Sequence, residues 1–152
     1  MRTLIIYISY SHGNTEKVAQ AIGEVLNAEL RSPASVSHEH IKEFDLIGFG
    51  SGNYYGKFDA RLTDLVENLP KMNGKKAFIF STSGRDVKNA HDPFRRLLLS
   101  KEFKVIGEFN CKGYDTYGTN RLMGGINNGR PNESDLRKAK GFAAEMIGWA
   151  SN

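Results

Sequence analysis

The stretch Ser9-Tyr10-Ser11-His12-Gly13-Asn14-Thr15-Glu16 decides the fold of this protein. It follows an apolar run from Thr3 to Ser9 and opens a segment of helical period from Thr15 to Leu26. A strand that passes through Ser and Gly directly into a helix brings hydroxyls, free backbone N–H groups and a helix N-terminus together. The stretch therefore predicts an anion site, although an ordinary helix-capping turn would use the same Gly, Asn and Thr.

Further apolar runs extend this pattern along the chain. Phe44 to Gly50 and Ala77 to Ser81 are uninterrupted, as expected for strands of a parallel sheet that is covered on both faces. Val105 to Cys111 is predicted to be another such buried strand, and Glu29 to Arg31 a short one. Together with the first run, the sequence predicts five strands.

Segments of helical period separate the predicted strands. They are Thr15 to Leu26, Ala60 to Leu69, Asp92 to Ser100 and Asp135 to Ala150, and Trp149 is expected on the buried face of the last one. Alternation of strand and helix favours right-handed crossovers, and hence an α/β fold with a doubly wound parallel sheet. The ligand of such a sheet binds among the loops at the carboxyl ends of the strands.

Length and composition indicate one domain, residues 1–152, because 152 residues suffice for one hydrophobic core. No apolar run approaches the roughly 20 residues of a membrane span, and the start lacks the order of a signal peptide. We expect no membrane insertion and a cytoplasmic location. The single cysteine, Cys111, is expected to be a small buried side chain without a redox role.

The charge of the chain bears on its partners. A net charge of +4 suits an acidic partner, but Lys and Arg are scattered and form no stripe interleaved with aromatic residues. We therefore expect no binding to nucleic acid. His38-Glu39-His40 offers two imidazoles at alternate positions with no third ligand nearby, so no metal site is predicted.

Four segments of the chain resemble the flavodoxin family. Gly13-Asn14-Thr15 ends a loop like the one with which the family binds the phosphate of flavin mononucleotide (FMN) without Lys or Arg. Phe49-Gly50-Ser51-Gly52-Asn53-Tyr54-Tyr55-Gly56-Lys57 is similar to its second flavin loop, and Phe80-Ser81-Thr82-Ser83-Gly84 to its third. The segment Gly125 to Glu133 looks like the entry to the last helix in a branch found in archaea and anaerobic bacteria. The likeness covers essentially the whole chain.

The resemblance implies a flavodoxin-like sheet with strand order 2-1-3-4-5, helices on both faces and FMN as the cofactor. The first loop departs from the family in being one residue longer, and His12 stands where a hydroxyl residue is usual. The residues that the resemblance assigns to the cofactor are Ser9, Ser11, His12, Gly13, Asn14, Thr15, Ser51, Gly52, Asn53, Tyr54, Tyr55, Gly56, Thr82, Ser83, Gly84, Arg85, Tyr114 and Asp115.

Individual roles follow from the chemistry of the flavin. Either Tyr54 or Tyr55 is expected to cover one face of the ring, since a flat tricyclic ring stacks on aromatic side chains. Gly52 and Gly56 would permit the peptide rotation by which the family stabilises its one-electron reduced state. The positive charge of Arg85 would favour the fully reduced flavin.

Two functions of different class remain open at this point. The first is an FMN-dependent electron carrier that shuttles electrons between redox partner proteins with acidic docking faces, and it needs no catalytic residues. The alternative is an NAD(P)H-dependent FMN quinone or flavin oxidoreductase of the same fold. A flavin-free module is a third reading. A phosphate-accepting receiver domain is disfavoured, because Ser9 and Ser51 stand where it needs acidic residues.

Overall fold

The structure is a computed structural model that describes residues 1–10, 12–84, 89–114 and 125–151. Its centre is one five-stranded sheet in the order β2-β1-β3-β4-β5, and every neighbouring pair of strands is parallel. The strands are β1 (Thr3–Tyr7), β2 (Glu29–Arg31), β3 (Leu46–Gly52), β4 (Lys76–Ser83) and β5 (Lys104–Lys112). The predicted strand order and fold class are confirmed.

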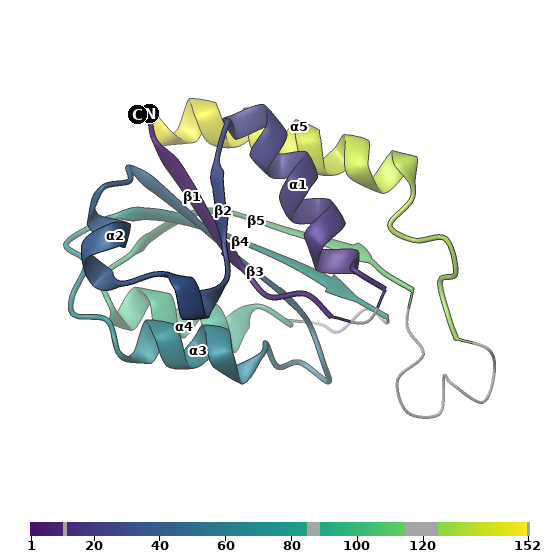
Figure 1. Cartoon of the computed structure of the whole chain (residues 1–152), viewed down its shortest axis with the longest axis horizontal. Helices are drawn as coiled ribbons and strands as arrows, with labels where there is room; N and C mark the ends of the chain where they lie inside the picture. Colours follow the sequence, from purple (N-terminus) through teal and green to yellow (C-terminus); the bar gives the residue numbers. More distant parts are fainter. Residues whose placement is uncertain (11, 85–88, 115–124, 152) are drawn as a thin grey trace.

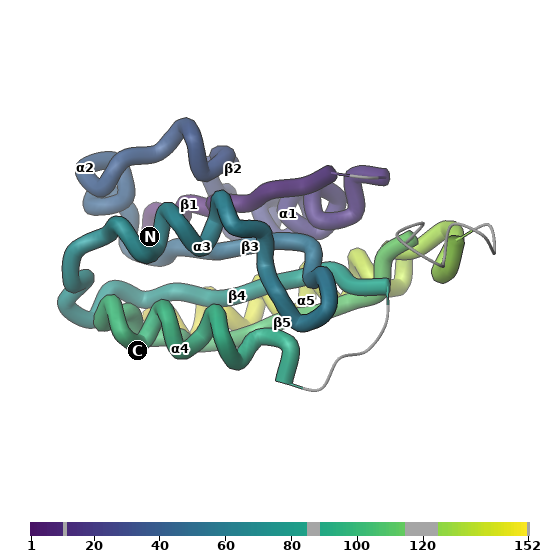
Figure 2. The backbone as a smooth tube through the Cα atoms, turned by 90° about the horizontal axis from the view of Figure 1, so that it is seen from below, coloured from purple at the N-terminus to yellow at the C-terminus, as the bar shows by residue number. Residues whose placement is uncertain are grey.

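Helices cover both faces of the sheet, as Figure 1 shows. Helices α1 (Asn14–Leu26) and α5 (Glu133–Ala150) lie over one face, and α3 (Ala60–Glu67) and α4 (Asp92–Ser100) over the other. In Figure 2 the molecule is seen from the side of α3 and α4, which run in front of the sheet. No helix in the part of the chain that the structure describes is long and apolar enough to cross a membrane.

Alternate residues of each central strand feed two separate cores. Ile5 of β1 and Phe80 of β4 belong to the core under α1 and α5, while Ile6 and Ile79 belong to the core under α3 and α4. This alternation follows from the pleat of a strand, which sends successive side chains to opposite faces. It explains why the strand runs are apolar without a break.

Glycine in β3 makes room for aromatic rings of β4. A Cβ atom on Gly50 would lie 2.1 Å from Cζ of Phe80, and one on Gly48 would lie 2.3 Å from Cζ of Phe78. These positions pair directly across the strands. The rings of β4 therefore lie over bare backbone of β3, which brings the two strands together under α1 and α5.

Three sequence expectations need correction. Strand β5 is largely half-exposed because it is an edge strand and has a neighbour on one side alone. Trp149 is 59 % exposed, since it falls beside the buried stripe of α5 that contains Ala139, Ala143 and Met146. The segment around His40, which is not among the predicted helices, forms the short helix α2 (His38–Lys42), preceded by the 3-10 turn Pro33–Ser35.

Candidate functional site

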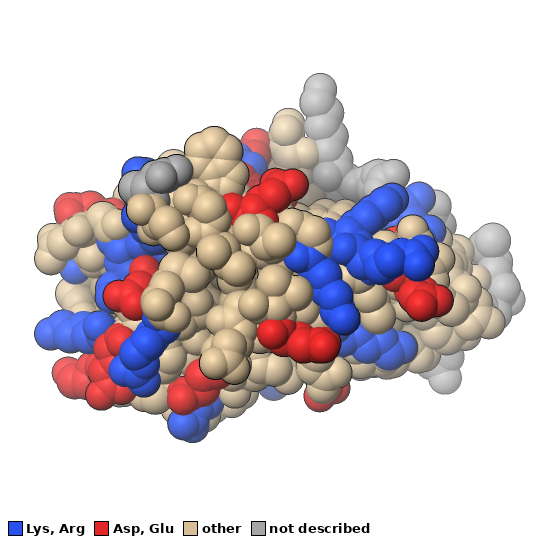
Figure 3. Space-filling model, turned by 90° about the horizontal axis from the view of Figure 1, so that it is seen from above, with Lys and Arg blue, Asp and Glu red and all other residues tan. Residues whose placement is uncertain are grey.

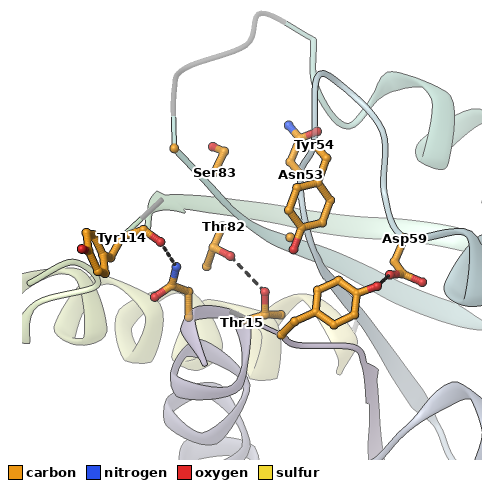
Figure 4. Close-up of a pocket in the computed structure, with 12 residues that line it drawn as sticks. Thr15, Asn53, Tyr54, Asp59, Thr82, Ser83 and Tyr114 are labelled. Carbon is orange, nitrogen blue, oxygen red and sulfur yellow. Dashed lines mark hydrogen bonds between the residues drawn. The ribbon is translucent and has the colours of Figure 1, made fainter. Parts of the chain in front are cut away.

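A cavity of about 460 Å³ lies at the carboxyl ends of the strands, which is where an open α/β sheet binds its ligands. The residues around it come from the last residues of β3 and β4, the start of α1 and the loops that follow β1, β3, β4 and β5 (Figure 4). They are Tyr10, Asn14, Thr15, Gly52, Asn53, Tyr54, Asp59, Thr82, Ser83, Gly84, Gly113 and Tyr114. Most of these residues were assigned to the cofactor from the sequence.

Three of the lining residues were missed by the sequence assignment. Tyr10 stands inside the first loop motif, where its ring was not considered as a wall of the site. Asp59 had a detectable signal, since Asp directly before a helical segment predicts an N-cap, and it does cap α3. Gly113 directly follows the last residue of β5 and precedes Tyr114, and this position at a strand end could have identified it.

The first loop enters the N-terminus of α1 through two residues with left-handed backbone. His12 and Gly13 both adopt left-handed backbone conformations, with φ angles of 56° and 63°. Gly13 is the N-cap residue of α1, and as a glycine it has no side chain that could cap the helix. The Ser9 hydroxyl accepts a hydrogen bond from the Glu16 N–H at 3.1 Å. Ser9 thus serves the helix end, as a capping side chain does.

Asn14 joins the first loop to the loop after β5. Its Nδ2 donates to the Tyr114 carbonyl oxygen at 2.8 Å. A Cβ atom on Gly113 would lie 2.5 Å from the same Nδ2, so glycine is required for this close approach. The His12 and Tyr114 rings also contact each other, with centroids 4.2 Å apart. These contacts fix the end of the cavity where Tyr114 stands.

The second loop separates the two candidate stacking tyrosines. Tyr54 and Lys57 exchange two backbone hydrogen bonds, of 2.8 and 3.0 Å, across a tight turn. Tyr55 and Gly56 form its tip, with φ angles of 53° and 83°, as a type I′ turn requires. The turn leaves the Tyr55 side chain 80 % exposed, whereas Tyr54 lines the cavity. The structure thus selects Tyr54 over Tyr55 as the wall of the site.

A buried amide stands without a partner at the bottom of this loop. The side chain of Asn53 lines the cavity, the residue is 7 % exposed, and its backbone N–H is bonded to the Thr82 carbonyl. Yet neither Oδ1 nor Nδ2 of Asn53 has a hydrogen-bond partner among the described residues. A buried amide in this state costs free energy unless a ligand satisfies it. Asn53 therefore holds an unsatisfied donor and an unsatisfied acceptor beside the cavity.

Hydroxyl groups of the third loop and of α1 complete the cavity floor. The Thr15 and Thr82 hydroxyls lie 2.9 Å apart, and Ser83 and Gly84 continue along the rim. Ser51, in contrast, turns away from the cavity. Its hydroxyl donates to the Gly52 carbonyl at 2.6 Å and accepts from the Asp59 N–H at 3.0 Å.

A charged cluster closes the side of the cavity near α3. The Tyr10 hydroxyl donates to Asp59 Oδ2 at 2.5 Å, and Arg61 bonds both Asp59 and the Tyr10 hydroxyl. Burial works to raise the pKa of Asp59, but the bonds from Arg61 and Tyr10 outweigh it and lower the pKa. The hydrogen bond to Asp59 in turn raises the pKa of the Tyr10 phenol. The wall therefore holds an ionised carboxylate beside a neutral phenol.

The remaining assigned residues contribute less or lie beyond the described chain. Gly56 lines a separate groove between α3 and α4. Ser11, Arg85 and Asp115 fall outside the described residues, so their roles stay predictions. Cys111 is buried, as expected, and burial together with the nearby Asp135 carboxylate raises its pKa to about 12.

Comparisons with known proteins agree with this architecture. A family model for the flavodoxin domain matches residues 4–118. A protein of Methanocaldococcus jannaschii described as uncharacterized is 46% identical over 149 residues, and the match covers 97% of this chain and 99% of that protein. A flavodoxin from the domain Archaea has a TM-score of 0.73 at 19% identity, with 100% of both chains covered. Flavodoxin 2 from Bacillus cereus has a TM-score of 0.72 at 22% identity, with 99% of both chains covered. The structural matches show the fold and the family model shows the family: this chain belongs to the flavodoxin family.

Proposed function

We propose that this protein binds FMN in the cavity and carries electrons between redox partner proteins. The observation that carries the proposal is the buried, unpartnered amide of Asn53 in a cavity lined by tyrosines and glycines. The edge of a flavin ring offers both hydrogen-bond donors and acceptors, so it can satisfy the two ends of that amide. Its flat faces suit tyrosine rings and bare glycine backbone.

The residues on each side of the cavity then have a role in binding FMN. Tyr54 and Tyr114 would cover the ring from different loops, and Gly52 leaves space beside Tyr54, since a Cβ there would lie 2.6 Å from the Tyr54 hydroxyl oxygen. The left-handed turn at His12 and Gly13 and the N-terminus of α1 would hold the phosphate. The bound flavin supplies redox chemistry in one-electron or two-electron steps. The residues orient the ring and exclude water from its buried side.

The surface charge supports an acidic partner. Figure 3 shows the face covered by α1 and α5, where Lys and Arg side chains lie toward both ends, with Asp and Glu side chains among them. Lys17, Arg137 and Lys140 line a shallow hollow between these two helices, with Glu24 and Glu133 among them. Lys140 is paired with Glu24 at 3.3 Å, so the net charge of +4 of the whole chain is what would attract an acidic redox protein.

The test is a flavin titration followed by anaerobic reduction. We expect the apoprotein to quench FMN fluorescence with one site per chain, and the complex to show a transient long-wavelength band during dithionite titration. Rapid reduction by NADPH without a partner protein would instead establish the oxidoreductase. Absence of FMN binding would overturn both functions.

A pair of asparagine variants makes the titration specific to the site. Asn53→Ala should weaken FMN binding about tenfold, the equivalent of one good hydrogen bond to a buried group. The same change should not destabilise the apoprotein, because it removes an unsatisfied buried amide. Asn68→Ala is the control, since Asn68 caps the end of α3 and does not line the cavity. Equal affinities of the two variants would contradict the proposed site.

A further inference from the structure

A chain of hydrogen bonds runs from the surface beside α4 to the cavity. His91 Nδ1 lies 3.0 Å from Glu108 Oε1, and His91 Nε2 lies 2.6 Å from Ser81 Oγ. Asn110 Nδ2 extends the chain, at 2.7 Å from Ser81 Oγ and 3.3 Å from Ser83 Oγ. Because Ser83 lines the cavity, the chain ends at the proposed flavin site.

The first three members have the order of a Ser-His-acid triad, but the serine cannot attack a substrate. Ser81 is 0 % exposed in the middle of the sheet, and His91 is 8 % exposed. A nucleophilic serine must reach the carbonyl group that it attacks. The arrangement is therefore suited to orienting other groups.

The acid end of the chain has a fixed polarity. Burial works to raise the pKa of Glu108, but hydrogen bonds from His91 and Arg95 lower it to about 2. Arg95 donates from Nε and Nη2 to the two carboxylate oxygens at 2.7 and 2.8 Å. An ionised carboxylate accepts hydrogen bonds and donates none, so the proton of the His91–Glu108 contact is on Nδ1.

The following bonds run from the ring to the end of β4. The other ring nitrogen of His91, Nε2, faces the Ser81 hydroxyl at 2.6 Å. Asn110 Nδ2 donates to the Ser81 hydroxyl oxygen at 2.7 Å and also lies 3.2 Å from the Ser81 carbonyl oxygen and 3.3 Å from Ser83 Oγ. The Ser83 hydroxyl donates to Asn110 Oδ1 at 3.5 Å, so the Asn110 amide holds the Ser83 side chain at the rim of the cavity.

We propose that His91 is a positioning residue of the flavin site, which acts through Ser81 and Asn110 to hold the Ser83 side chain in place at the pyrimidine end of the flavin. His91 does not line the cavity, and its ring does not cap α4 within the described chain, although it is the N-cap residue. The ring packs edge-on against Phe58, with centroids 5.5 Å apart. This inference rests on the proposed function, because Ser83 meets a flavin if the cavity holds one.

A double-mutant cycle between His91 and Ser83 tests the inference, with the dissociation constant of FMN and the midpoint potential as readouts. His91→Phe should weaken FMN binding about threefold to tenfold, the equivalent of one directed hydrogen bond. In the Ser83→Ala background the same change should have no effect, because the hydroxyl that it acts through is gone. The His91→Gln variant should keep most of the affinity for FMN, since the amide oxygen of glutamine can accept a hydrogen bond from the Ser81 hydroxyl.

Further variants keep the test decisive. If His91→Phe fails to fold, Ser81→Ala breaks the same chain with a smaller change and should show the same coupling to Ser83. His38→Phe on α2 is the matched control and should bind FMN like the original protein. An equal loss of affinity in both Ser83 backgrounds would mean a merely structural role and overturn the inference. A protein that fails to bind FMN at all overturns the proposed function as well, so the two failures are distinguishable.

Discussion

The hydroxyl oxygens of Thr15 and Thr82 lie 2.9 Å apart and join the first turn of α1 to the end of β4. Thr15 is 2 % and Thr82 is 4 % exposed, so neither hydroxyl has ready access to water. The pair stands at the floor of the cavity, as Figure 4 shows. The contact ties the start of α1, which follows the loop after β1, to the end of β4 at the edge of the cavity.

Valine substitutions should show that the threonine pair works as a unit. Thr15→Val or Thr82→Val alone should lower the free energy of unfolding by about 1–3 kcal/mol, because each leaves a buried hydroxyl unpaired. The double variant should lose less than the sum of the two, since no unpaired hydroxyl remains. Urea denaturation of the apoproteins measures this, and strictly additive losses would contradict the assignment.

Two glycines that differ in their surroundings should respond oppositely to alanine. Gly113→Ala should weaken FMN binding, because its Cβ would lie 2.5 Å from Asn14 Nδ2 and break the bond to Tyr114. Gly141, within α5, has no described atom within 4 Å of an added Cβ. Gly141→Ala should therefore leave affinity unchanged and stabilise the fold by roughly 0.5–1 kcal/mol. Thermal unfolding and FMN titration together check both expectations.

Acid should lower the free energy of unfolding, partly because it protonates Glu108. Its pKa in the folded protein is about 2, below the ordinary 4.5, so its ionised form stabilises the fold above pH 4.5. That stabilisation is lost as the pH falls from 4.5 toward 2. Glu108→Gln should cost on the order of 2 kcal/mol at neutral pH and progressively less in acid. Denaturation of both proteins across this range is the measurement, and a difference that stays constant with pH would refute the linkage.

Cys111 should be chemically silent in the folded protein. Burial and the Asp135 carboxylate raise its pKa to about 12, and the thiolate is the reactive form. At pH 8 we expect iodoacetamide to label the native protein at least about 100-fold more slowly than the unfolded chain. Cys111→Ala should bind FMN and accept electrons as before. Fast labelling of the native protein would show that the thiol is accessible.

The fold was predictable because its signals are local. The runs that became β1, β3 and β4 are apolar without a break, and a strand needs that pattern when both of its faces are covered. The run that became β5 has Glu108 and Asn110 among its apolar residues and lies at the edge, and strand order depends on how distant segments pack. Trp149 was misplaced for a related reason, since the buried stripe of α5 is determined by the strands beneath it.

By itself, the sequence determined the alternation of strands and helices, the turn from β1 into α1 and most residues that line the cavity, because each depends on neighbours along the chain. The tertiary structure alone decided that Tyr54 lines the cavity and Tyr55 is exposed, because the backbone is left-handed at Tyr55 and Gly56. It alone left the Asn53 amide unpartnered and joined Ser81, His91 and Glu108 into one chain. Such contacts form between side chains of different elements, and packing the whole sheet is what brings those atoms within bonding distance.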